Sequence, residues 1–557
     1  MLSRSSKYIS RRFPSNITNS LLVSSTPVFI RSLHFSKPES LPTNKVKSLT
    51  TFQKYNFSQT MTQNNSVQIS SVDEVAKIKN LSIFEITTSK PEQAGETFLV
   101  NDPATEDIIG QLPDMGLKET TAAIEKASEA YKSWSKVGAR VRKEKILAWY
   151  ELILKNKEDL ARMITIECGK PYPEAIGEIL YGASFVEWFA QEAIRSDGDT
   201  MPILTPSQRI FTTKQPVGVV GLITPWNFPN AMITRKAGAA IAAGCTAVIK
   251  PSPETPYSAI ALKNLALQAG IPDGVINIVT TMKNVQEVGK ELTTHPKIKK
   301  ISFTGSTAVG KLLLSQASGS VKKPSMELGG NAPFIVFDDA NINDAVDGLM
   351  ICKFRNAGQT CVCANRIFVH SAIYDEFVSK AMTRMKETLK IGHGIIPGST
   401  LGPVITEKAA AKMETILADA VSKGATVHEI IPESLKPQKG YFCMPKVLTD
   451  VNMDMVCAKE EIFGPICGII KFDSEEDVLA KVNNVPVGLA GYFYSNNISR
   501  IYRVAEAIEV GMIGVNTGLI GSEVLPFGGV KESGLGREGS KYGLDEFLQI
   551  KSIVISI

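Results

Sequence analysis

The sequence predicts an α/β protein with two parallel-sheet domains, and three observations lead to this fold class. The chain has 557 residues, which is too long for one simple core and fits roughly two to four domains. From residue 215 onward, short buried apolar runs alternate with helical segments of about ten residues, as in βαβ units. Similar alternation runs from residue 332 to about residue 515, which indicates a second α/β domain.

Two long helical regions precede this alternation. Across residues 119–169, apolar residues recur at helical spacing, as they do from Ile146 to Ile153. Gly169, followed closely by a proline, supplies a stop signal for that region. A second long helix is expected over residues 175–193.

The alternating elements follow in order from residue 215. They are a strand in PVGVVGLITP, a helix over 232–243, a strand in TAVIKP, a helix over 258–268, a strand in VINIV, a helix over 285–293 and a strand in KISFTG. The longest apolar run, 237–249, is shorter than the roughly 18 residues of a membrane helix and predicts a buried helix-to-strand turn. The C-terminal KSIVISI is a strand with no partner in its own neighbourhood.

Composition excludes several classes of protein. The chain is 43% hydrophobic and 21% charged, as an ordinary soluble protein is, and its net charge of +5 makes no case for nucleic acid. No membrane partner is expected. The five histidines never reach metal-ligand spacing, and the eight cysteines contain no CxxC pair. We therefore expect neither a metal site nor a disulfide framework.

The N-terminal leader, residues 1–60, has the composition of a mitochondrial transit peptide. It is Ser/Thr-rich, and the first 72 residues hold nine Lys or Arg against one Glu. RSLHFS at residues 31–36 has the Arg-x-Leu-x-x-Ser form expected around matrix processing. These features predict the mitochondrial matrix. The alternative is a disordered tail, or an extension upstream of a cytoplasmic protein that starts at Met61.

Two segments bring together the residues that indicate catalysis, RNAGQTCVCANR with Cys361 and SMELGGNAPFIVF with Glu327. A thiol, a carboxylate and no usable histidine suggest covalent chemistry on a carbonyl. A lone cysteine is more often a small buried hydrophobe, and a glutamate at a strand end is more often solvated. Gly358 and its neighbours predict a tight turn into a helix, whose N-terminus would favour the thiolate of Cys361.

These segments resemble the signature motifs of the aldehyde dehydrogenase superfamily, and CVCANR is most similar to its succinate-semialdehyde branch. The resemblance covers about residues 101–557, with several motifs in the family's order. It implies that Cys361 attacks the aldehyde carbon and that Glu327 is the general base. It also implies that Asn227, in TPWNFP, forms the oxyanion hole with the backbone N–H of Cys361.

The resemblance also implies the arrangement of domains. We expect two Rossmann-like parallel-sheet domains and a small β arm that joins copies into a dimer or tetramer. The arm would pair the segment before residue 215 with the C-terminal strand. The expected ranges are 61–194 and 215–328 for the coenzyme-binding domain, 329–535 for the catalytic domain, and 195–214 and 536–557 for the oligomerisation arm.

The glycine loop FTGSTAVGKL nearly spells a P-loop, but Leu312 stands where a Mg²⁺-binding Ser or Thr is required. The family resemblance instead implies a loop that lies under the pyrophosphate of NAD or NADP. The residues expected to hold the coenzyme are Pro225, Trp226, Lys250, Ser252, Pro253, Gly305, Ser306, Leu328 and Glu461.

Coenzyme choice depends on the sequence KPSPE. NAD-selective relatives place a glutamate where this chain has Pro253, and Glu254 comes one residue late. We therefore expect NADP to be accepted, with NAD also used. The alternative is that the loop shifts and Glu254 takes the place of the missing glutamate.

The resemblance to the succinate-semialdehyde branch also implies residues that bind the substrate and a cysteine that could control activity by oxidation. Arg235 and Arg355 match positions that grip a substrate carboxylate, although a single arginine is usually part of a structural ion pair. Ser522 either replaces the branch's serine, which normally stands one residue earlier, or that hydrogen bond is lost. Cys363 either forms a regulatory disulfide with Cys361 or simply packs.

The expected function is NAD(P)-dependent oxidation of succinate semialdehyde to succinate, at the end of 4-aminobutyrate breakdown. The alternatives are a broader aldehyde dehydrogenase, a P-loop nucleotidase and a non-catalytic scaffold.

Overall fold

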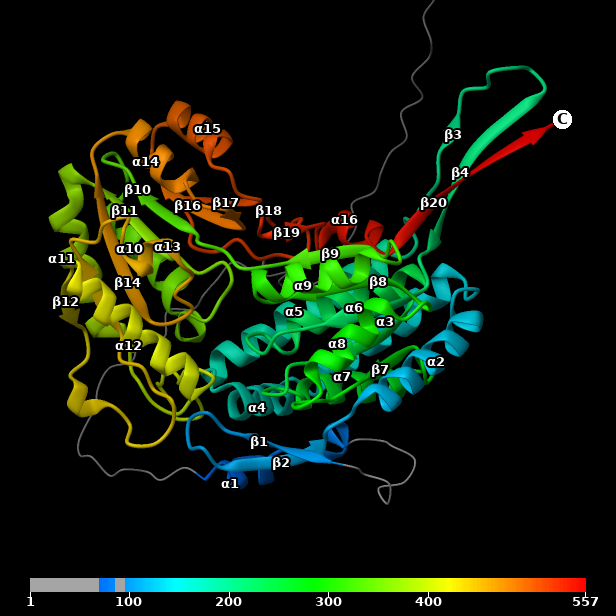
Figure 1. Ribbon diagram of the computed structural model, residues 1–557, viewed down its shortest axis with the longest axis horizontal. Coiled ribbons are helices and arrows are strands. Elements are labelled where there is room, and N and C mark those ends of the chain that lie inside the picture. The colour runs from blue at the N-terminus through cyan, green and yellow to red at the C-terminus, as the bar shows by residue number, and fades with distance from the viewer. Residues whose placement is uncertain (1–69, 86–95) are drawn as a thin grey trace, which may run out of the picture. The chain divides into compact units, whose positions relative to one another are not determined.

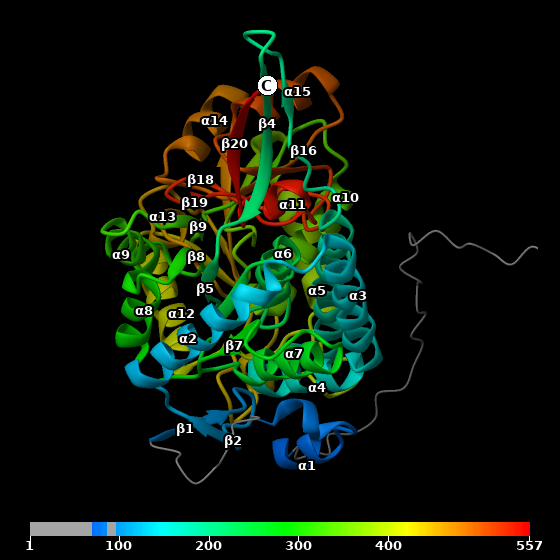
Figure 2. The ribbon, with the colours of Figure 1, turned by 90° about the vertical axis from the view of Figure 1, so that its right-hand side faces the viewer.

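A computed structural model describes residues 70–85 and 96–557 (Figures 1 and 2). The leader, on which the targeting prediction depends, lies outside the described residues. No helix in the described part of the chain is both long enough and apolar enough to cross a membrane.

The first sheet has six strands in the order β19-β9-β8-β5-β6-β7. Strands β9, β8, β5, β6 and β7 run parallel to one another, and β19 at the edge is antiparallel to β9. This confirms the parallel sheet predicted from residue 215 onward. The strands are β5 (Val219–Ile223), β6 (Thr246–Lys250), β7 (Ile276–Ile278), β8 (Ile298–Thr304), β9 (Lys323–Glu327) and β19 (Gly534–Leu535).

Three of the helices that connect these strands lie where the sequence placed them. They are α6 (Ala231–Ala243), α7 (Tyr257–Gln268) and α8 (Val285–Thr294). A fourth helix, α9 (Thr307–Ser318), connects β8 to β9. Every residue of α6, β5 and β6 is buried. The apolar run 237–249 is therefore a buried helix-to-strand turn, as predicted, and it turns at Gly244, whose φ of 95° suits glycine.

The helical region of residues 119–169 is confirmed, and it consists of three helices. They are α2 (Leu117–Trp134), α3 (Ala139–Lys155) and α4 (Lys157–Cys168), and the long α5 (Tyr172–Glu192) follows. Asn156 separates α3 from α4, because its backbone leaves the helical region and its side chain donates to the carbonyl of Leu152 at 2.8 Å. Gly169 ends α4 with a left-handed φ of 79°, as its stop signal predicted.

The second sheet has seven strands in the order β12-β13-β14-β11-β10-β16-β17, and only β12 is antiparallel to its neighbour. The second α/β domain is therefore present. Its strands are β10 (Pro333–Val336), β11 (Arg366–His370), β12 (Thr426–Glu429), β13 (Lys446–Thr449), β14 (Ile466–Phe472), β16 (Ala490–Tyr494) and β17 (Met512–Val515). Its helices are α10 (Ile342–Phe354), α11 (Tyr374–Thr388), α12 (Glu407–Ser422), α13 (Val456–Lys459), α14 (Glu475–Asn483) and α15 (Ile498–Ala507).

The C-terminal strand finds its partner far away in the sequence. β20 (Leu548–Ser556) pairs antiparallel with β4 (Gln208–Pro216) along its whole length, and β3 (Thr200–Met201) adds a short third strand. β4 and β20 extend together beyond the two sheets (Figures 1 and 2). The side chains of Ile550 and Val554 on β20 are 68% and 58% exposed.

The remaining elements are short. They are α1 (Ser71–Ala76), η1 (Leu81–Phe84), β1 (Thr97–Asn101), β2 (Ile108–Pro113), η3 (Arg355–Gly358), η4 (Ser371–Ile373), η5 (Glu433–Leu435), β15 (Val487–Gly488), β18 (Val530–Lys531) and α16 (Ser540–Asp545). β1 and β2 form a hairpin.

Candidate active site

The loop that carries Cys361 is not the start of a helix, so this expectation was wrong. Asn356 and Ala357 adopt left-handed conformations, with φ of 52° and 53°, after α10 has ended. A turn follows, in which the N–H of Cys363 donates to the carbonyl of Thr360 at 2.9 Å, and the chain then enters β11. No helix N-terminus is therefore present here to favour a thiolate.

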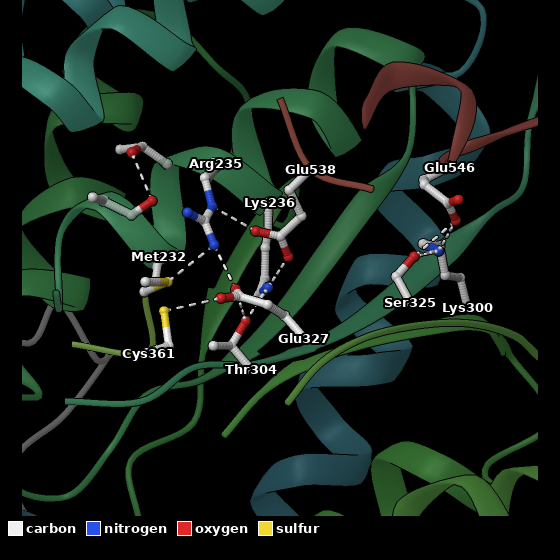
Figure 3. A network of polar contacts seen from close by, with 12 residues as sticks. Met232, Arg235, Lys236, Lys300, Thr304, Ser325, Glu327, Cys361, Glu538 and Glu546 are labelled. Carbon is white, nitrogen blue, oxygen red and sulfur yellow. Dashed lines mark hydrogen bonds and ion pairs between the residues drawn. The ribbon is translucent and has the colours of Figure 1, made fainter. Parts of the chain in front are cut away.

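Cys361 and Glu327 do meet, as the sequence predicted (Figure 3). Glu327 is the last residue of β9 in the first sheet, and the thiol of Cys361 donates to its Oε1 at 3.3 Å. Burial raises the pKa of the Cys361 thiol well above its ordinary value, and the charge of Glu327 raises it further, against an opposing effect of Arg235. The thiol is therefore protonated at rest, with a carboxylate oxygen in position to take its proton.

The second oxygen of Glu327 is held by two donors. Arg235 on α6 donates from Nη2 to Oε2 at 2.5 Å, and the hydroxyl of Thr304 at the end of β8 donates to the same oxygen at 3.0 Å. The carboxylate is buried. Glu327 is thus fixed at both oxygens, with one oxygen directed to the thiol and the other to the guanidinium.

Glu538 completes this buried network, and sequence reasoning missed it. Its Oε2 accepts from Nε of Arg235 at 2.6 Å, and its Oε1 pairs with the ammonium of Lys236 (Figure 3). Lys236 also donates to Thr304 Oγ1 at 2.6 Å. Burial by itself raises the pKa of Glu538. The charges of Lys236 and Arg235 together lower it by more, so the pKa lies below its ordinary value. Glu538 lies in the motif GLGREGS, and nothing local in that motif indicates where its carboxylate points.

The two candidate substrate arginines differ sharply. Arg235 is 1% exposed, engages both carboxylates and stacks 4.2 Å from the centre of the Phe527 ring. Arg355 is half-buried and forms no ion pair with any residue in the described ranges. Its guanidinium lies 5.4 Å from the centre of the Phe228 ring, and its buried Nε has no hydrogen-bond partner there. The charge of Arg355 is felt by the half-buried Glu174, because it opposes the larger effect of burial, which raises the pKa of that carboxyl.

Tyr181 on α5 is hydrogen-bonded to Arg235 and feels the charge of Arg355, and it too was missed. Burial raises the pKa of its phenol, while the nearby charges of Arg235 and Arg355 lower it. A Cβ added at Gly521 would lie 3.4 Å from its hydroxyl, so the loop around residue 521 contacts Tyr181 closely. The neighbouring Ser522 uses its hydroxyl within the loop, donating to Glu523 at 3.2 Å and accepting from the N–H of Val524 at 3.4 Å.

The turn that contains Asn227 is fixed from several directions. Its carbonyl accepts from the buried Lys170 at 2.9 Å and from the side chain of Asn356 at 3.1 Å. Its side-chain amide donates to the carbonyl of Gln359 at 3.1 Å, which directs the amide to the loop of Cys361. Lys170 is paired with Glu178, and this buried pair was not anticipated from the sequence. The arrangement fits an oxyanion hole beside Cys361.

Cys363 is buried. Its thiol donates to the carbonyls of Lys353 and Ala364, at 3.4 and 3.5 Å. Burial raises the pKa of Cys363, and the nearby ammonium of Lys353 opposes that effect. All eight cysteines of the chain lie within the described residues and are free thiols.

The residues expected to hold a coenzyme line the carboxyl ends of the first sheet. Lys250 ends β6, and burial lowers its pKa to about 8, against the opposing charge of Glu254. Ser252 next to Pro253 donates its hydroxyl to Glu254, which holds that carboxylate on its own loop. Ser306 is the N-cap of α9, and a Cβ at the preceding Gly305 would come within 2.4 Å of a ring atom of Phe303. This close loop at a helix N-terminus fits a pyrophosphate.

The second domain contributes Glu461 and Phe463 to this region, and Pro225, Trp226 and Leu328 come from the first. Glu461 is half-buried, and burial raises its pKa to about 7, while the N–H of Gly330 that donates to it at 3.4 Å lowers it. The half-buried Trp226, which follows the half-buried Pro225, packs edge-on against Phe463. Leu328 is buried. Together with Lys250 and Ser306, these residues have the mixture of apolar surface and polar ends that a dinucleotide requires.

Comparisons with known proteins agree with this geometry. Residues 90–553 match the model of the aldehyde dehydrogenase family. The mitochondrial succinate-semialdehyde dehydrogenase of Mus musculus is 54% identical over 83% of this chain and 88% of its own length. The glutarate-semialdehyde dehydrogenase of Pseudomonas aeruginosa is 52% identical over 83% of this chain and 94% of its own length.

Solved structures give the same result. The succinate-semialdehyde dehydrogenase from Burkholderia pseudomallei superimposes with a TM-score of 0.81 at 49% identity, over 84% of this chain and 95% of its own. An NADP-dependent enzyme from E. coli gives a TM-score of 0.81 at 50% identity, over 84% of this chain and 96% of its own. The family model over residues 90–553, the relatives at 52–54% identity and the contact between Cys361 and Glu327 together show that this chain belongs to the aldehyde dehydrogenase family.

Proposed function

We propose that this enzyme oxidises succinate semialdehyde to succinate with NAD(P). The observation that carries the proposal is Arg355, a half-buried guanidinium without an ion-pair partner in the described residues, six residues before the nucleophile. A guanidinium fork suits a carboxylate. A dicarboxylic semialdehyde has both groups that this arrangement needs, an aldehyde for Cys361 and a carboxylate for Arg355.

The reaction begins with a proton transfer. The Cys361 thiol gives its proton to Glu327 Oε1, which lies 3.3 Å away, and the sulfur electron pair then attacks the aldehyde carbon. The carbonyl electrons move to oxygen, and the amide of Asn227 with the backbone N–H of Cys361 would stabilise that alkoxide. Thr304 keeps Glu327 oriented during this step, because it donates to the other oxygen.

When bound, the nicotinamide coenzyme accepts the hydride that leaves the substrate carbon. The residues that would hold it are Lys250, Ser306 and Glu461. The product of this oxidation is a thioester on Cys361. Glu327 first releases the proton of the thiol to solvent and is a carboxylate again. It then takes a proton from water as the water oxygen attacks the thioester carbon. The Cys361 thiolate leaves as the new carboxyl group of succinate forms, and it takes back a proton from Glu327. One carboxylate thus serves both halves of the reaction.

Both coenzymes are proposed to be used, with NADP accepted. The carboxylate of Glu254 is bound to Ser252 rather than free to repel a 2′-phosphate, which supports this choice. Comparing kcat/KM for NAD and NADP tests it. A preference for NAD of about a hundredfold, or roughly 2.7 kcal/mol, would contradict it.

The competing substrate is one methylene longer. The relative from Pseudomonas aeruginosa is named for glutarate semialdehyde, and a single methylene in a pocket changes kcat/KM by only about 1–3 kcal/mol. A panel of succinate semialdehyde, glutarate semialdehyde and butanal, followed by NAD(P)H absorbance, decides among them. We expect the order as written. Equal kcat/KM for butanal and succinate semialdehyde would make this a general aldehyde dehydrogenase.

Location and assembly complete the proposal. Residues 1–60 have transit-peptide composition, and several curated relatives carry the word mitochondrial in their names, so we place the enzyme in the mitochondrial matrix. Cell fractionation with N-terminal sequencing tests this, and a cytosolic product that starts at Met61 would contradict it.

The extended β4 and β20 pair with its exposed apolar residues supports a dimer or tetramer.

A further inference from the structure

The helix α5 carries two carboxylates that each hold one side of the catalytic site. Glu174 and Glu178 are four positions apart, so they lie on the same face of this helix. Glu174 accepts from the N–H of Asn356 at 2.7 Å, in the loop that leads to the nucleophile. Glu178 accepts from the N–H groups of Asn230 and Ala231 at 2.8 and 3.2 Å, where α6 begins. One helix thus holds the nucleophile loop and the turn of the proposed oxyanion donor.

Lys170 connects this helix directly to the turn of Asn227. Its ammonium pairs with Glu178, donates to the carbonyl of Asn227 at 2.9 Å and lies 3.8 Å from the centre of the Phe228 ring. Both side chains of the ion pair are 0% exposed, so water cannot take the place of either partner. A buried ion pair contributes little net stability, because the desolvation of both charges offsets their attraction. The geometry that the pair holds is therefore the better explanation for it.

The orientation of Asn227 depends on such contacts with its backbone. Its side-chain amide has two hydrogens and donates to the carbonyl of Gln359 at 3.1 Å, which leaves one hydrogen for an alkoxide on the substrate carbon. Its Oδ1 is buried and has no partner in the part of the chain that the structure describes. The carbonyl of Asn227, in contrast, accepts from both Lys170 and Asn356. The free hydrogen is therefore aimed by the backbone.

We propose that Lys170, Glu178 and Glu174 are positioning residues for the oxyanion hole. Lys170 and Glu178 fix Asn227, which supplies the side-chain donor, and Glu174 fixes the loop that supplies the backbone N–H of Cys361. A misplacement of about 1 Å in a reacting group can lower the rate by roughly 100-fold, so these contacts control the speed of the first covalent step. The inference rests on the role of Asn227 in the proposed function, and it holds for any substrate with a carbonyl oxygen.

The first test compares two reactions of Cys361 that differ in their need for an oxyanion hole. Acylation by 4-nitrophenyl acetate passes through an alkoxide and is followed as the burst of 4-nitrophenolate. Alkylation by iodoacetamide displaces iodide at a saturated carbon and forms no alkoxide. Lys170→Met should slow acylation about 10- to 100-fold and leave alkylation within about twofold of wild type. A parallel loss in both reactions would mean that Lys170 only supports the fold, and it would overturn the proposal.

The second test asks whether Lys170 acts through Asn227. Asn227→Ala removes the side-chain donor and should itself slow acylation by about 100-fold or more. In the Asn227→Ala background, Lys170→Met should slow acylation by less than about a further twofold, because the group that it positions is already absent. Slowings that multiply would overturn the proposal.

The same experiments separate this proposal from the proposed function. If Asn227→Ala alone leaves acylation unchanged, Asn227 is not an oxyanion donor, and the proposal fails with that role. Neither probe needs the coenzyme or succinate semialdehyde, so the outcome does not depend on which aldehyde the enzyme oxidises.

Two further variants keep the test decisive. Lys322→Met removes another buried lysine that donates to backbone carbonyls, those of His295 and Ile298 at 2.8 and 2.9 Å, before β9 begins. It should leave both reactions unchanged, and slowing of acylation as large as that in Lys170→Met would overturn the proposal. Because the loss of Lys170 leaves a buried carboxylate and can prevent folding, Glu174→Ala removes a half-buried side chain instead. It should slow acylation about 3- to 10-fold without changing alkylation, and unchanged acylation would overturn the proposal.

Discussion

Truncation of Arg355 to alanine should separate substrates by charge. Arg355 is the cation proposed to bind the substrate carboxylate, and it is half-buried with a buried Nε that lacks a partner in the described residues. Arg235 cannot fully replace it, because that guanidinium already serves Glu327 and Glu538. Arg355→Ala therefore removes the fork proposed to bind the carboxylate and leaves Cys361 and Glu327 in place.

The structure sets the size of the effect. Truncating one partner of a buried charged pair costs about 2–5 kcal/mol, and the partial exposure of Arg355 favours the lower part, roughly 2–4 kcal/mol. At about 1.4 kcal/mol per tenfold change, kcat/KM for succinate semialdehyde should fall by roughly 30- to 1000-fold. Butanal loses only the contact of the arginine with Phe228, a packing and cation–π interaction that is worth about 0.5–1 kcal/mol.

The assay is steady-state NAD(P)H formation with both aldehydes, on wild type, Arg355→Ala and Arg355→Lys. The lysine variant keeps the charge but loses the fork, so its loss should be intermediate. Thermal unfolding of all three proteins controls for a general loss of structure. If Arg355→Ala lowers kcat/KM equally for butanal and succinate semialdehyde, Arg355 supports the loop and does not recognise a carboxylate.

Four further predictions concern other parts of the site and the arm. Cys361→Ala should abolish turnover but retain coenzyme binding by fluorescence, and turnover above a few per cent of wild type would exclude it as the nucleophile. Because the pKa of Lys250 is lowered to about 8, the free enzyme loses this cation as the pH rises through that value. The Kd of NADPH should therefore increase there, and the Kd of NADH should change less. The same pH dependence of Kd for both coenzymes would contradict this. If Cys363 forms a regulatory disulfide with Cys361, dithiothreitol should restore activity after peroxide treatment in wild type and not in Cys363→Ala. Because the thiol of Cys363 is buried against backbone carbonyls, we expect this inactivation by peroxide to be slow. Val554→Lys on the exposed face of β20 should shift the assembly to smaller species in light scattering if the arm joins copies of the chain.

The sequence predicted the framework of the fold because its signals are local. Strands β5 to β8 and the helices between them appear as apolar runs and periodic segments of their own lengths. The meeting of Cys361 and Glu327 followed from a family resemblance. The helix expected after Cys361 is absent, because the chain makes only one turn at residues 360–363 and then enters β11. The left-handed conformations of Asn356 and Ala357 just before it are uncommon for residues other than glycine and were not predicted either.

The charge network could not be predicted, because its members are distant in the sequence. Arg235 and Glu538 are separated by 303 positions, and neither motif indicates that the two side chains meet. For Arg235 the sequence left open a structural ion pair or a grip on the substrate carboxylate. The ion pairs are present, and the substrate role stays a prediction. Lys170 and Glu178, which fix the turn of Asn227, are likewise recognisable only from their contacts.

The reactive pair is assembled across two sheets, and this constrains how the enzyme can work. Glu327 ends β9 in the first sheet, residues 328–332 connect it to β10 in the second, and Cys361 lies in the loop before β11. The base is therefore tied to the coenzyme side, and the nucleophile to the catalytic side. A Cβ at Gly330, in the connection itself, would come within 3.0 Å of the carbonyl of Cys361, so the two sides are in close contact there.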